Sequence, residues 1–429
     1  MVNPEAPLES GPVPVKGKWS PILYGFVEFD AIHDSTQSFN DIAGNVPIKP
    51  SGTYGGDHAR TTFGVRNSRI GFKLSAPETA RVHASGILEM DFIGNQPSDA
   101  SENAFFTNPT FRIRHFAMKL EDPYVDVLLG QYWQLFGWQS FFHPNTVEIQ
   151  GLPAEVYSRT PQARFSHRFE TRPVNLELAV SASRPGQRDS AVPDLTAGVR
   201  LSINGWKGLH TSGTGATATA QDGMSIGVSG IGRHIRVPEL SATPTSSVSK
   251  NAGGISVDAF LPVIPASLED RRNGLTLTGS FVVGTGISDL YTGLTGGVTF
   301  PALPNPTNAT PAPTYTPGLD NGLATFDSSG NLHTINWLSY ILGVQYYPLQ
   351  TFWLSANFSH LNSSNAGDFV TTATASKVFT RSWWADGNVF WDALPSVRFG
   401  LEYAYFHQTY ANDKDAHNQR WQASGFFLF

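Results

Sequence analysis

The chain has 429 residues, of which 15% are charged, 40% are hydrophobic and 12% are aromatic, and its formal net charge at pH 7 is −6. This composition is too polar for a helical membrane protein and too aromatic for a disordered chain. The acidic balance gives no indication of a nucleic-acid partner. The chain contains no cysteine, which excludes thiol catalysis and thiolate metal sites and favours an oxidising compartment.

Alternation of polar and apolar residues is the main signal along the chain. Between Arg81 and Phe92, for example, Glu89 and Asp91 alternate with Met90. Successive side chains of a strand point to opposite faces, so such segments are predicted to be two-faced strands. About sixteen segments show the pattern: 21–33, 60–76, 80–94, 111–121, 125–137, 157–170, 174–183, 194–203, 224–235, 254–262, 275–288, 334–347, 352–361, 376–392, 397–410 and 419–429. Phase slips within 60–76 and 111–121 suggest β-bulges.

The connections between these segments alternate in length. Five are tight turns, at 77–79, 122–124, 171–173, 348–350 and 394–396, whereas those after the odd-numbered strands are long loops. Two turns, 204–223 and 263–274, are longer than the pattern expects. Short turns on one side and long loops on the other are typical of outer-membrane barrels, and an even strand number puts both termini on the periplasmic side.

Aromatic residues gather near the ends of the predicted strands, as the girdles of a membrane barrel do. No apolar run reaches the ~18 residues of a membrane-spanning helix. A soluble β-sandwich core is the alternative, but it would not normally place large apolar residues on single alternating faces along nearly the whole chain. We therefore predict an all-β fold, a closed antiparallel transmembrane β-barrel of about 16 strands in the bacterial outer membrane.

The barrel is predicted to cover residues 20–429. The proline-rich residues 1–19 lack the basic and apolar regions of a secretory signal, so we expect them to form a flexible periplasmic N-terminus. The long extracellular loop 289–333 is rich in Pro, Thr, Asn and Gly and lacks a strand pattern. It is therefore predicted to form a cap at the surface.

The chain ends in WQASGFFLF, residues 421–429. This segment resembles the C-terminal strand of bacterial outer-membrane proteins. The resemblance implies that Phe429 is an assembly signal, which the barrel-assembly machinery reads during insertion, and that it has no role in transport.

Four further segments resemble trimeric porins, especially the DcaP-type group: YGFVEFDA at 24–31, NSRIGFKL at 67–74, FRIRH at 111–115 and LGQYWQLF at 129–136. The resemblance covers about the first third of the chain well and the rest only as a strand pattern. It implies a sixteen-stranded barrel, a homotrimer and the passage of small solutes. It also implies that the third long loop, 138–156, folds into the lumen; an outward position of this loop is the alternative. The N-terminal coiled-coil heptads of some DcaP-type members have no counterpart in this sequence.

Charged residues on the strands are predicted to face the lumen, because a charge on the lipid face costs ~2–4 kcal/mol near the midplane. The third, fourth and sixth strands carry a basic group on one wall: Arg81, Arg112, Arg114, Arg164 and Arg168. We expect the narrowest part of the pore between this wall and the inward loop, with a preference for small anions such as organic acids.

Further pore-lining residues are predicted next to this wall: Arg200, Glu89 and Asp91 on strands, and His143 and Glu148 in the loop. The alternative is that the arginines are solvated wall residues, neutralised by acids such as Glu89 and Asp91.

Enzymatic motifs are absent from the sequence. No serine lies in a nucleophile elbow, and no histidine pair has the spacing of a metal motif such as His-Glu-x-x-His. We therefore expect no catalytic residue, metal or cofactor. The predicted function is a porin for passive diffusion of small hydrophilic solutes, surrounded by membrane lipid and lipopolysaccharide. The alternative is a plugged structural or adhesive barrel that binds a partner through its long loops.

Overall fold

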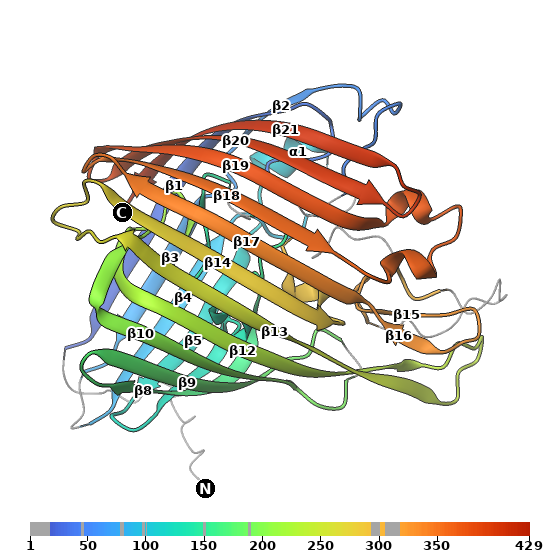
Figure 1. Ribbon diagram of the computed structural model, residues 1–429, viewed down its shortest axis with the longest axis horizontal. Helices are drawn as coiled ribbons and strands as arrows, with labels where there is room; N and C mark the ends of the chain where they lie inside the picture. The colour runs from blue at the N-terminus through green and yellow to red at the C-terminus, as the bar shows by residue number, and fades with distance from the viewer. Residues whose placement is uncertain are drawn as a thin grey trace, which may run out of the picture.

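The computed structural model describes residues 18–43, 47–77, 81–96, 99, 101–148, 152–187, 190–292, 301–304 and 318–429. Tilted antiparallel strands form a closed barrel (Figure 1). The first strand closes it by pairing with the last one on one side and with the second on the other. The second barrel strand is split into two segments, so 17 segments make the 16 strands.

In chain order the barrel strands are β1 (Ser20–Asp34), β2 (Arg60–Gly64) with β3 (Arg69–Ser75), β4 (His83–Asp91), β5 (Arg112–Glu121), β6 (Asp126–Trp133), β8 (Arg159–Glu170), β9 (Val174–Ser183), β10 (Asp194–His210), β12 (Ala220–Pro238), β13 (Ser247–Ile264), β14 (Gly274–Thr285), β17 (Asn336–Tyr347), β18 (Phe352–Asn362), β19 (Phe379–Leu394), β20 (Val397–Tyr410) and β21 (Asp415–Leu428). The connections carry α1 (Glu102–Thr107), η1 (Phe136–Trp138), β7 (Asn145–Thr146), β11 (Gly213–Thr214), η2 (Ser288–Leu290), β15 (Ala324–Phe326), β16 (Leu332–Thr334), η3 (Ala366–Phe369) and η4 (Ala375–Lys377).

The barrel buries polar side chains and exposes apolar ones, the reverse of a soluble protein. On β20, Phe399 and Leu401 are 48% and 45% exposed, whereas Arg398 and Glu402 are buried inside. Apolar side chains face outward because the barrel is surrounded by hydrocarbon rather than by water. The closed sheet suits this surrounding, because all of its backbone polar groups form hydrogen bonds within the sheet. No helix among the described residues is long and apolar enough to cross a membrane.

Both predicted phase slips correspond to real irregularities. The second strand is interrupted between Gly64 and Arg69, where Asn67 turns inward and donates to Asp30 Oδ2 at 2.7 Å. On β5 the register shifts so that Glu89 faces His115 while Met90 faces Ile113. This bulge allows the consecutive residues Arg114 and His115 both to be buried inside the barrel.

The first of the two unexpectedly long turns is shorter than the sequence suggests. β10 continues to His210 and β12 begins at Ala220, so the connection covers residues 211–219 rather than 204–223. The pairing shifts between Ile203 and Lys207. This irregularity interrupts the alternation of polar and apolar residues, so the sequence pattern did not show that β10 continues beyond Ile203.

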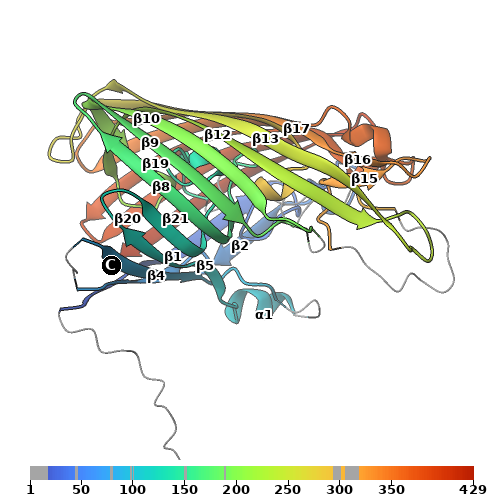
Figure 2. The ribbon, with the colours of Figure 1, turned by 90° about the horizontal axis from the view of Figure 1, so that it is seen from below.

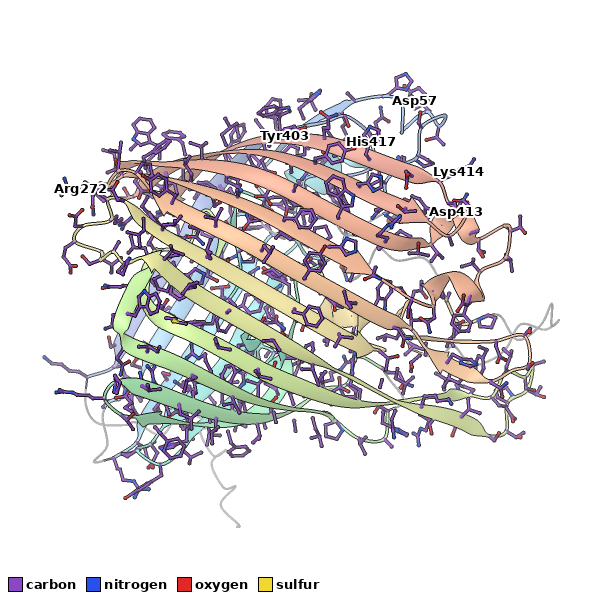
Figure 3. All side chains as sticks on the ribbon, in the orientation of Figure 1. Asp57, Arg272, Tyr403, Asp413, Lys414 and His417 are labelled. Carbon is purple, nitrogen blue, oxygen red and sulfur yellow. The ribbon has the colours of Figure 1, made fainter. Side chains whose placement is uncertain are left out.

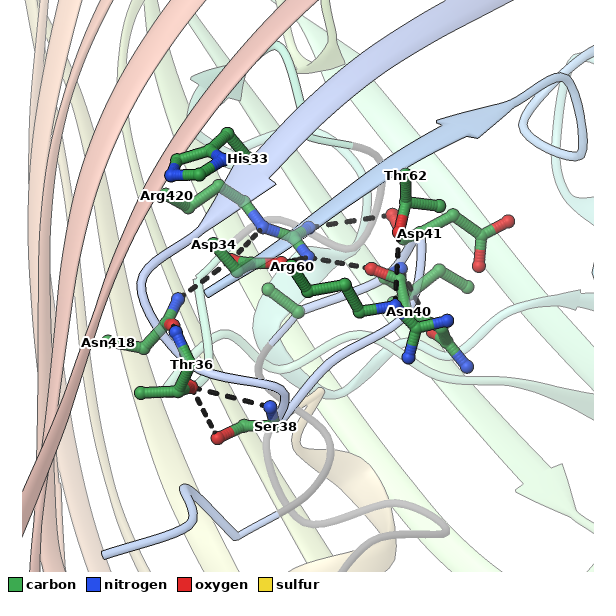
Figure 4. Close-up of polar contacts among 12 residues, drawn as sticks. His33, Asp34, Thr36, Ser38, Asn40, Asp41, Arg60, Thr62, Asn418 and Arg420 are labelled. Carbon is green, nitrogen blue, oxygen red and sulfur yellow. Dashed lines mark hydrogen bonds and ion pairs between the residues drawn. The ribbon is translucent and has the colours of Figure 1, made fainter. Parts of the chain in front are cut away.

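The first and last strands form a tightly bonded seam. At its periplasmic end Gly25 N donates to Phe429 O at 2.9 Å. Towards the extracellular end, Arg420 donates to both carboxylate oxygens of Asp34, at 2.9 and 2.8 Å, and to Asn40 O at 2.8 Å (Figure 4). These contacts hold the first extracellular loop against the inside of the barrel.

The two ends of the barrel differ. The C-terminus lies at the end with the short turns, and α1 and the β15–β16 hairpin belong to connections of the other end (Figure 2). This hairpin corrects the expectation that loop 289–333 lacks strands. Residues 293–300 and 305–317 of that loop, and residues 1–17 of the predicted N-terminal segment, lie outside the described residues.

Candidate functional site

The connection between β6 and β8 crosses the lumen. Gly137 N donates to Ser229 Oγ on β12 at 2.8 Å. Further along, Trp353 Nε1 on β18 donates to Asn145 Oδ1 at 3.1 Å. Because the loop is bonded to inner faces far from its own strands, its described residues, 138–148 and 152–156, lie inside the barrel, as predicted.

A periplasmic turn meets this loop inside the lumen. Residues 211–219 fold inward, and β11 pairs in parallel with β7. Gly213 N donates to Pro144 O at 2.7 Å, and Gly215 N donates to Thr146 O at 2.8 Å. On the barrel wall, Arg398 Nη1 donates to Thr217 O at 2.9 Å. The sequence showed an overlong turn here but gave no signal for its inward position.

A cavity of about 320 Å³ remains between the loop, the inward turn and one wall. The wall is formed by β1 and β3–β6, and it contributes charged and aromatic side chains. The lining residues are Tyr24, Arg69, Lys73, Ile87, Glu89, Arg114, His115, Tyr132, Trp133, Ser140, His143, Tyr157, Ser212, Gly213, Thr214 and Thr217.

Arg114 lies at the centre of the wall and is fully bonded. Its Nε is 2.7 Å from Glu89 Oε1, its Nη1 is 3.0 Å from Asp91 Oδ2, and its Nη2 donates to Tyr157 OH at 3.2 Å. Arg112 also binds Asp91, through Nε at 3.0 Å and Nη2 at 2.6 Å. Two carboxylates therefore already serve two guanidinium groups.

Two further arginines, Arg69 and Arg159, have guanidinium N–H groups without a hydrogen-bond partner in the protein. Nε and Nη2 of Arg69 have no hydrogen-bond partner, and the nearest carboxylate oxygen, on Glu89, is 3.7 Å from Nε. The guanidinium of Arg159 stacks 4.9 Å from the ring of Trp133, and its Nη1 also has no partner. Charged donors that are buried and unpaired require water or an anion as partner.

The inward loop places a buried pair of titratable groups opposite this wall. His143 Nδ1 lies 3.2 Å from Glu155 Oε1, and both side chains are buried. Burial lowers the pKa of His143 to about 3 and raises the pKa of Glu155 well above its usual value. Burial thus favours the neutral form of both groups. The four arginines and the two carboxylates of the wall leave an excess of two positive charges.

Five of the predicted pore residues come together here: Arg112, Arg114, Glu89, Asp91 and His143. Others do not. Arg81 lies at the periplasmic rim with its side chain 62% exposed, 2.7 Å from Asp122. Arg168 is 46% exposed beside Glu170, because it lies close to the end of β8.

The remaining predicted residues lie inside the barrel but away from the cavity lining. Arg164 donates to Gln162 Oε1 at 3.1 Å, and Arg200 donates to Glu177 Oε2 at 3.1 Å. Glu148 accepts from Ala43 N at 3.1 Å, near the first loop. The predicted constriction wall is therefore wrong for these residues. Strand alternation shows which face of the sheet a residue lies on, but not how far along the barrel axis it lies.

Arg159 and Tyr157 escaped prediction. Alternation on β8 assigns Arg164 and Arg168 to the lumen and Arg159 to the lipid, but Arg159 begins the strand directly after the inward loop. The fixed alternation of a strand does not hold at such an end. Among the described residues, no cluster of His, Asp, Glu or Cys side chains could hold a metal ion.

No protein-family model and no curated protein sequence matches the chain. Its fold matches that of the outer membrane channel DcaP of Acinetobacter baumannii, with a TM-score of 0.68 at 16% identity, over 97% of this chain and 99% of that chain. The chain has the fold of a bacterial outer-membrane porin. Two more distant matches of this porin fold are the anion-selective porin from Comamonas acidovorans (TM-score 0.53, 9% identity, 96% of this chain and 100% of that chain) and the trimer form of OmpT of Vibrio cholerae (0.51, 8%, 96% and 100%).

The porin fold and the apolar exterior together are those of a bacterial outer-membrane protein. Closed barrels of this kind span the membrane with strands and have a polar interior. In this barrel the cavity beside Arg114 lies between the inward loop and the wall.

Proposed function

We propose that this chain is a passive channel for small hydrophilic solutes that prefers anions, and that the wall of Arg69, Arg112, Arg114 and Arg159 sets the preference. The observations that carry this proposal are the unpaired donors of two arginines: Arg69 lines a cavity of about 320 Å³, and Arg159 stacks on Trp133 and Tyr157 of that lining. Guanidinium groups stay charged at every working pH and bind carboxylate or phosphate in a bidentate manner. Small anions, including organic acids, are therefore the expected solutes.

The surplus of positive charge argues against the alternative of a neutralised wall. Glu89 and Asp91 do pair with arginines, but Arg69 approaches Glu89 only to 3.7 Å, and it and Arg159 keep donors without a hydrogen-bond partner. In a partly dehydrated constriction the field of these groups exceeds its value in bulk water. The anion selectivity of the Comamonas acidovorans porin, which shares the fold, is in keeping with the proposal.

We also propose that the chain works as a homotrimer, for which the trimer form of OmpT offers a precedent. Large apolar side chains project outward from the first strands. Phe29 and Phe63 stack at 5.9 Å, both more than half exposed, and Phe116 is 64% exposed. A monomeric mass in mild detergent would contradict this part of the proposal.

The reversal potential in a salt gradient across a planar bilayer tests the selectivity. Replacing Arg159 by Gln (R159Q) removes one unpaired charge and should lower the anion-to-cation permeability ratio about fivefold, the effect of ~1 kcal/mol. The matched control is R168Q, which alters an exposed arginine on the same strand and should leave the ratio unchanged. Cation preference in the unmodified protein, or equal effects of both substitutions, would refute the arginine wall.

A plugged barrel is the second candidate, and the inward turn at 211–219 favours it. The turn and the loop are bonded to each other, and apolar residues such as Val147, Tyr347 and Phe390 pack together inside the barrel. Such a barrel would carry no steady current. Single-channel conductance therefore decides between the two functions before selectivity is measured.

A further inference from the structure

Five aromatic rings lie in one row across five successive strands on the outside of the barrel. Register pairs Tyr340 with His360, His360 with Trp383, Trp383 with His407 and His407 with His417. We call this set the histidine row. Girdles at membrane interfaces are usually made of Trp and Tyr, whereas three of the five positions here are histidines.

The histidine row faces away from the lumen, since the preceding or following residue on each strand is buried. These buried neighbours are Ser339, Ser359, Trp384, Phe406 and Asn418. The rings support one another: the centroid of Tyr340 lies 5.2 Å from that of His360, and the centroid of Trp383 lies 5.4 Å from that of His407. The row is therefore an ordered surface.

The row marks the extracellular boundary of the lipid-facing band. His417 lies on β21 towards the end that carries Asp413 and Lys414, and Arg272 lies at the opposite end (Figure 3). On β19 the outward Trp391, 51% exposed, is eight residues from Trp383. That separation is about 26 Å along the strand and, at a tilt of about 40°, about 20 Å of height, close to the height of the apolar band of such barrels. The histidine row therefore lies at the level of the outer-leaflet head groups.

Arg381 adds a fixed positive charge just above the row. It lies two residues before Trp383 on β19, between Asn362 and Thr409 in the register. Its side chain is exposed, and within the described part of the chain it has no carboxylate partner. The positive charge of Arg381 is close enough to His360 and His407 to disfavour their protonation, so these two histidines gain their charge at a lower pH than a free histidine.

The other charged groups near the row nearly cancel. Asp415 on β21 lies 3.7 Å from His407, while β17 and β18 contribute Asn336 and Asn362 and no fixed charge. The connections between β18 and β19 and between β20 and β21 carry two acids and two bases: Asp368, Asp413, Lys377 and Lys414. Together with Arg381 and Asp415 their fixed charges sum to zero. In the connection that leads into β17, Asp289 is paired with Arg233 and Asp327 with His333, and Asp320 adds one further acid. The titratable charge of the row itself comes from its histidines.

We propose that the histidine row and Arg381 bind the phosphate groups of outer-leaflet lipopolysaccharide, and that binding strengthens as the histidines gain protons. The inference rests on the outer-membrane location and not on the pore. Histidine titrates near pH 6.5, and each positive charge at a membrane surface contributes about 1 kcal/mol towards an anionic lipid. A girdle of Tyr and Trp could not change its charge in this range.

A lipid fits this surface better than a second copy of the chain. The row continues downward into Leu342, Phe358 and Ala385, which face outward in the next row. Acyl chains therefore have an apolar surface directly below the site for the phosphate. In lipopolysaccharide the phosphate and carbohydrate groups lie above the acyl chains. On this surface the histidine row and Arg381 lie above the apolar residues in the same order.

The test titrates lipopolysaccharide onto the full chain in detergent and follows the midpoint of thermal unfolding at about pH 5 and about pH 8. We expect affinity to be about fivefold higher at the lower pH, which corresponds to one gained charge. The variant H360Q/H407Q/H417Q should lose this pH dependence, and R381Q should weaken binding at both pH values. The matched control is H83Q/H167Q, which changes two histidines near the periplasmic turns and should behave like the unmodified protein.

Three outcomes would overturn the proposal. The first is equal binding of dephosphorylated lipopolysaccharide, and the second is equal binding of phosphatidylglycerol. The third is a change in oligomeric state, rather than in lipid affinity, in the triple variant, which would make the row an interface between copies. If the triple variant fails to fold, R381Q and the single substitution H407Q carry the same test. Channel conductance is a separate measurement, so this proposal and the proposed function can fail independently.

Discussion

Arg114 Nε lies 2.7 Å from Glu89 Oε1, and this buried ion pair joins β5 to β4 at the β-bulge. The bulge turns Arg114 and His115 to the same side, so the guanidinium reaches Glu89 and Asp91 together. The pairing of Arg114 with both carboxylates thus depends on one backbone irregularity.

Replacing Arg114 by Gln should destabilise the barrel by roughly 3–5 kcal/mol, because it leaves the buried carboxylate of Glu89 without its main partner. Unfolding in denaturant measures this loss. The double variant E89Q/R114Q removes both charges and should recover much of the stability. If the double variant is as unstable as R114Q, the two side chains are not coupled.

The seam between β1 and β21 should also depend on a buried ion pair. Asp34 and Arg420 are both almost fully buried and share two hydrogen bonds. D34N should cost about 3–5 kcal/mol in the free energy of unfolding. The exposed pair of Asp270 and Arg272 provides the control, since D270N should leave the free energy of unfolding nearly unchanged.

The inward turn should control conductance if the lumen is open. A Cβ at Gly215 would lie 2.5 Å from Cε1 of Phe390, so G215L should push the turn off the wall at a cost of about 1–3 kcal/mol. We expect a larger single-channel conductance. The control is G205L, because a Cβ at Gly205 meets no atom within 4 Å. An unchanged conductance in G215L would show that the turn does not limit the current.

The buried His143 should make the fold sensitive to acid. Burial lowers the pKa of His143 to about 3, so between about pH 6.5 and pH 3 the unfolded chain binds a proton that the folded chain does not. Stability is therefore complete above about pH 6.5 and declines as the pH falls. From pH 7 to pH 5 the loss due to His143 is about 2 kcal/mol. In H143Q the difference in unfolding free energy between these pH values should shrink by that amount.

Phe429 is predicted to act in assembly, as its resemblance to other outer-membrane proteins implies. Its backbone bonds to Gly25 while its side chain is 47% exposed to the outside. F429A should therefore reduce the amount of protein inserted in cells without changing the stability of the refolded barrel. Cell fractionation and unfolding measured in parallel check both halves, and an equal loss in both would make Phe429 a structural residue only.

The sequence determined the barrel almost completely. All sixteen predicted segments correspond to barrel strands, and the two phase slips lie at the interruption after Gly64 and at the bulge around Arg114. The physical reason is that a strand between lipid and lumen must alternate apolar and polar side chains along its whole length. The polarity of each residue therefore indicates which face of the sheet it lies on.

The tertiary structure alone decided which charges meet. Alternation placed Arg81 and Arg168 on the basic wall, yet both lie at the periplasmic rim. Arg159, at a strand end where alternation fails, instead stacks on Trp133 and Tyr157 of the cavity lining. The inward position of residues 211–219 was equally hidden, because it rests on hydrogen bonds from Gly213 and Gly215 to a loop some 70 residues away. A local pattern records the face that a side chain takes, but the height along the barrel and the path of a loop through the lumen follow from contacts between distant segments.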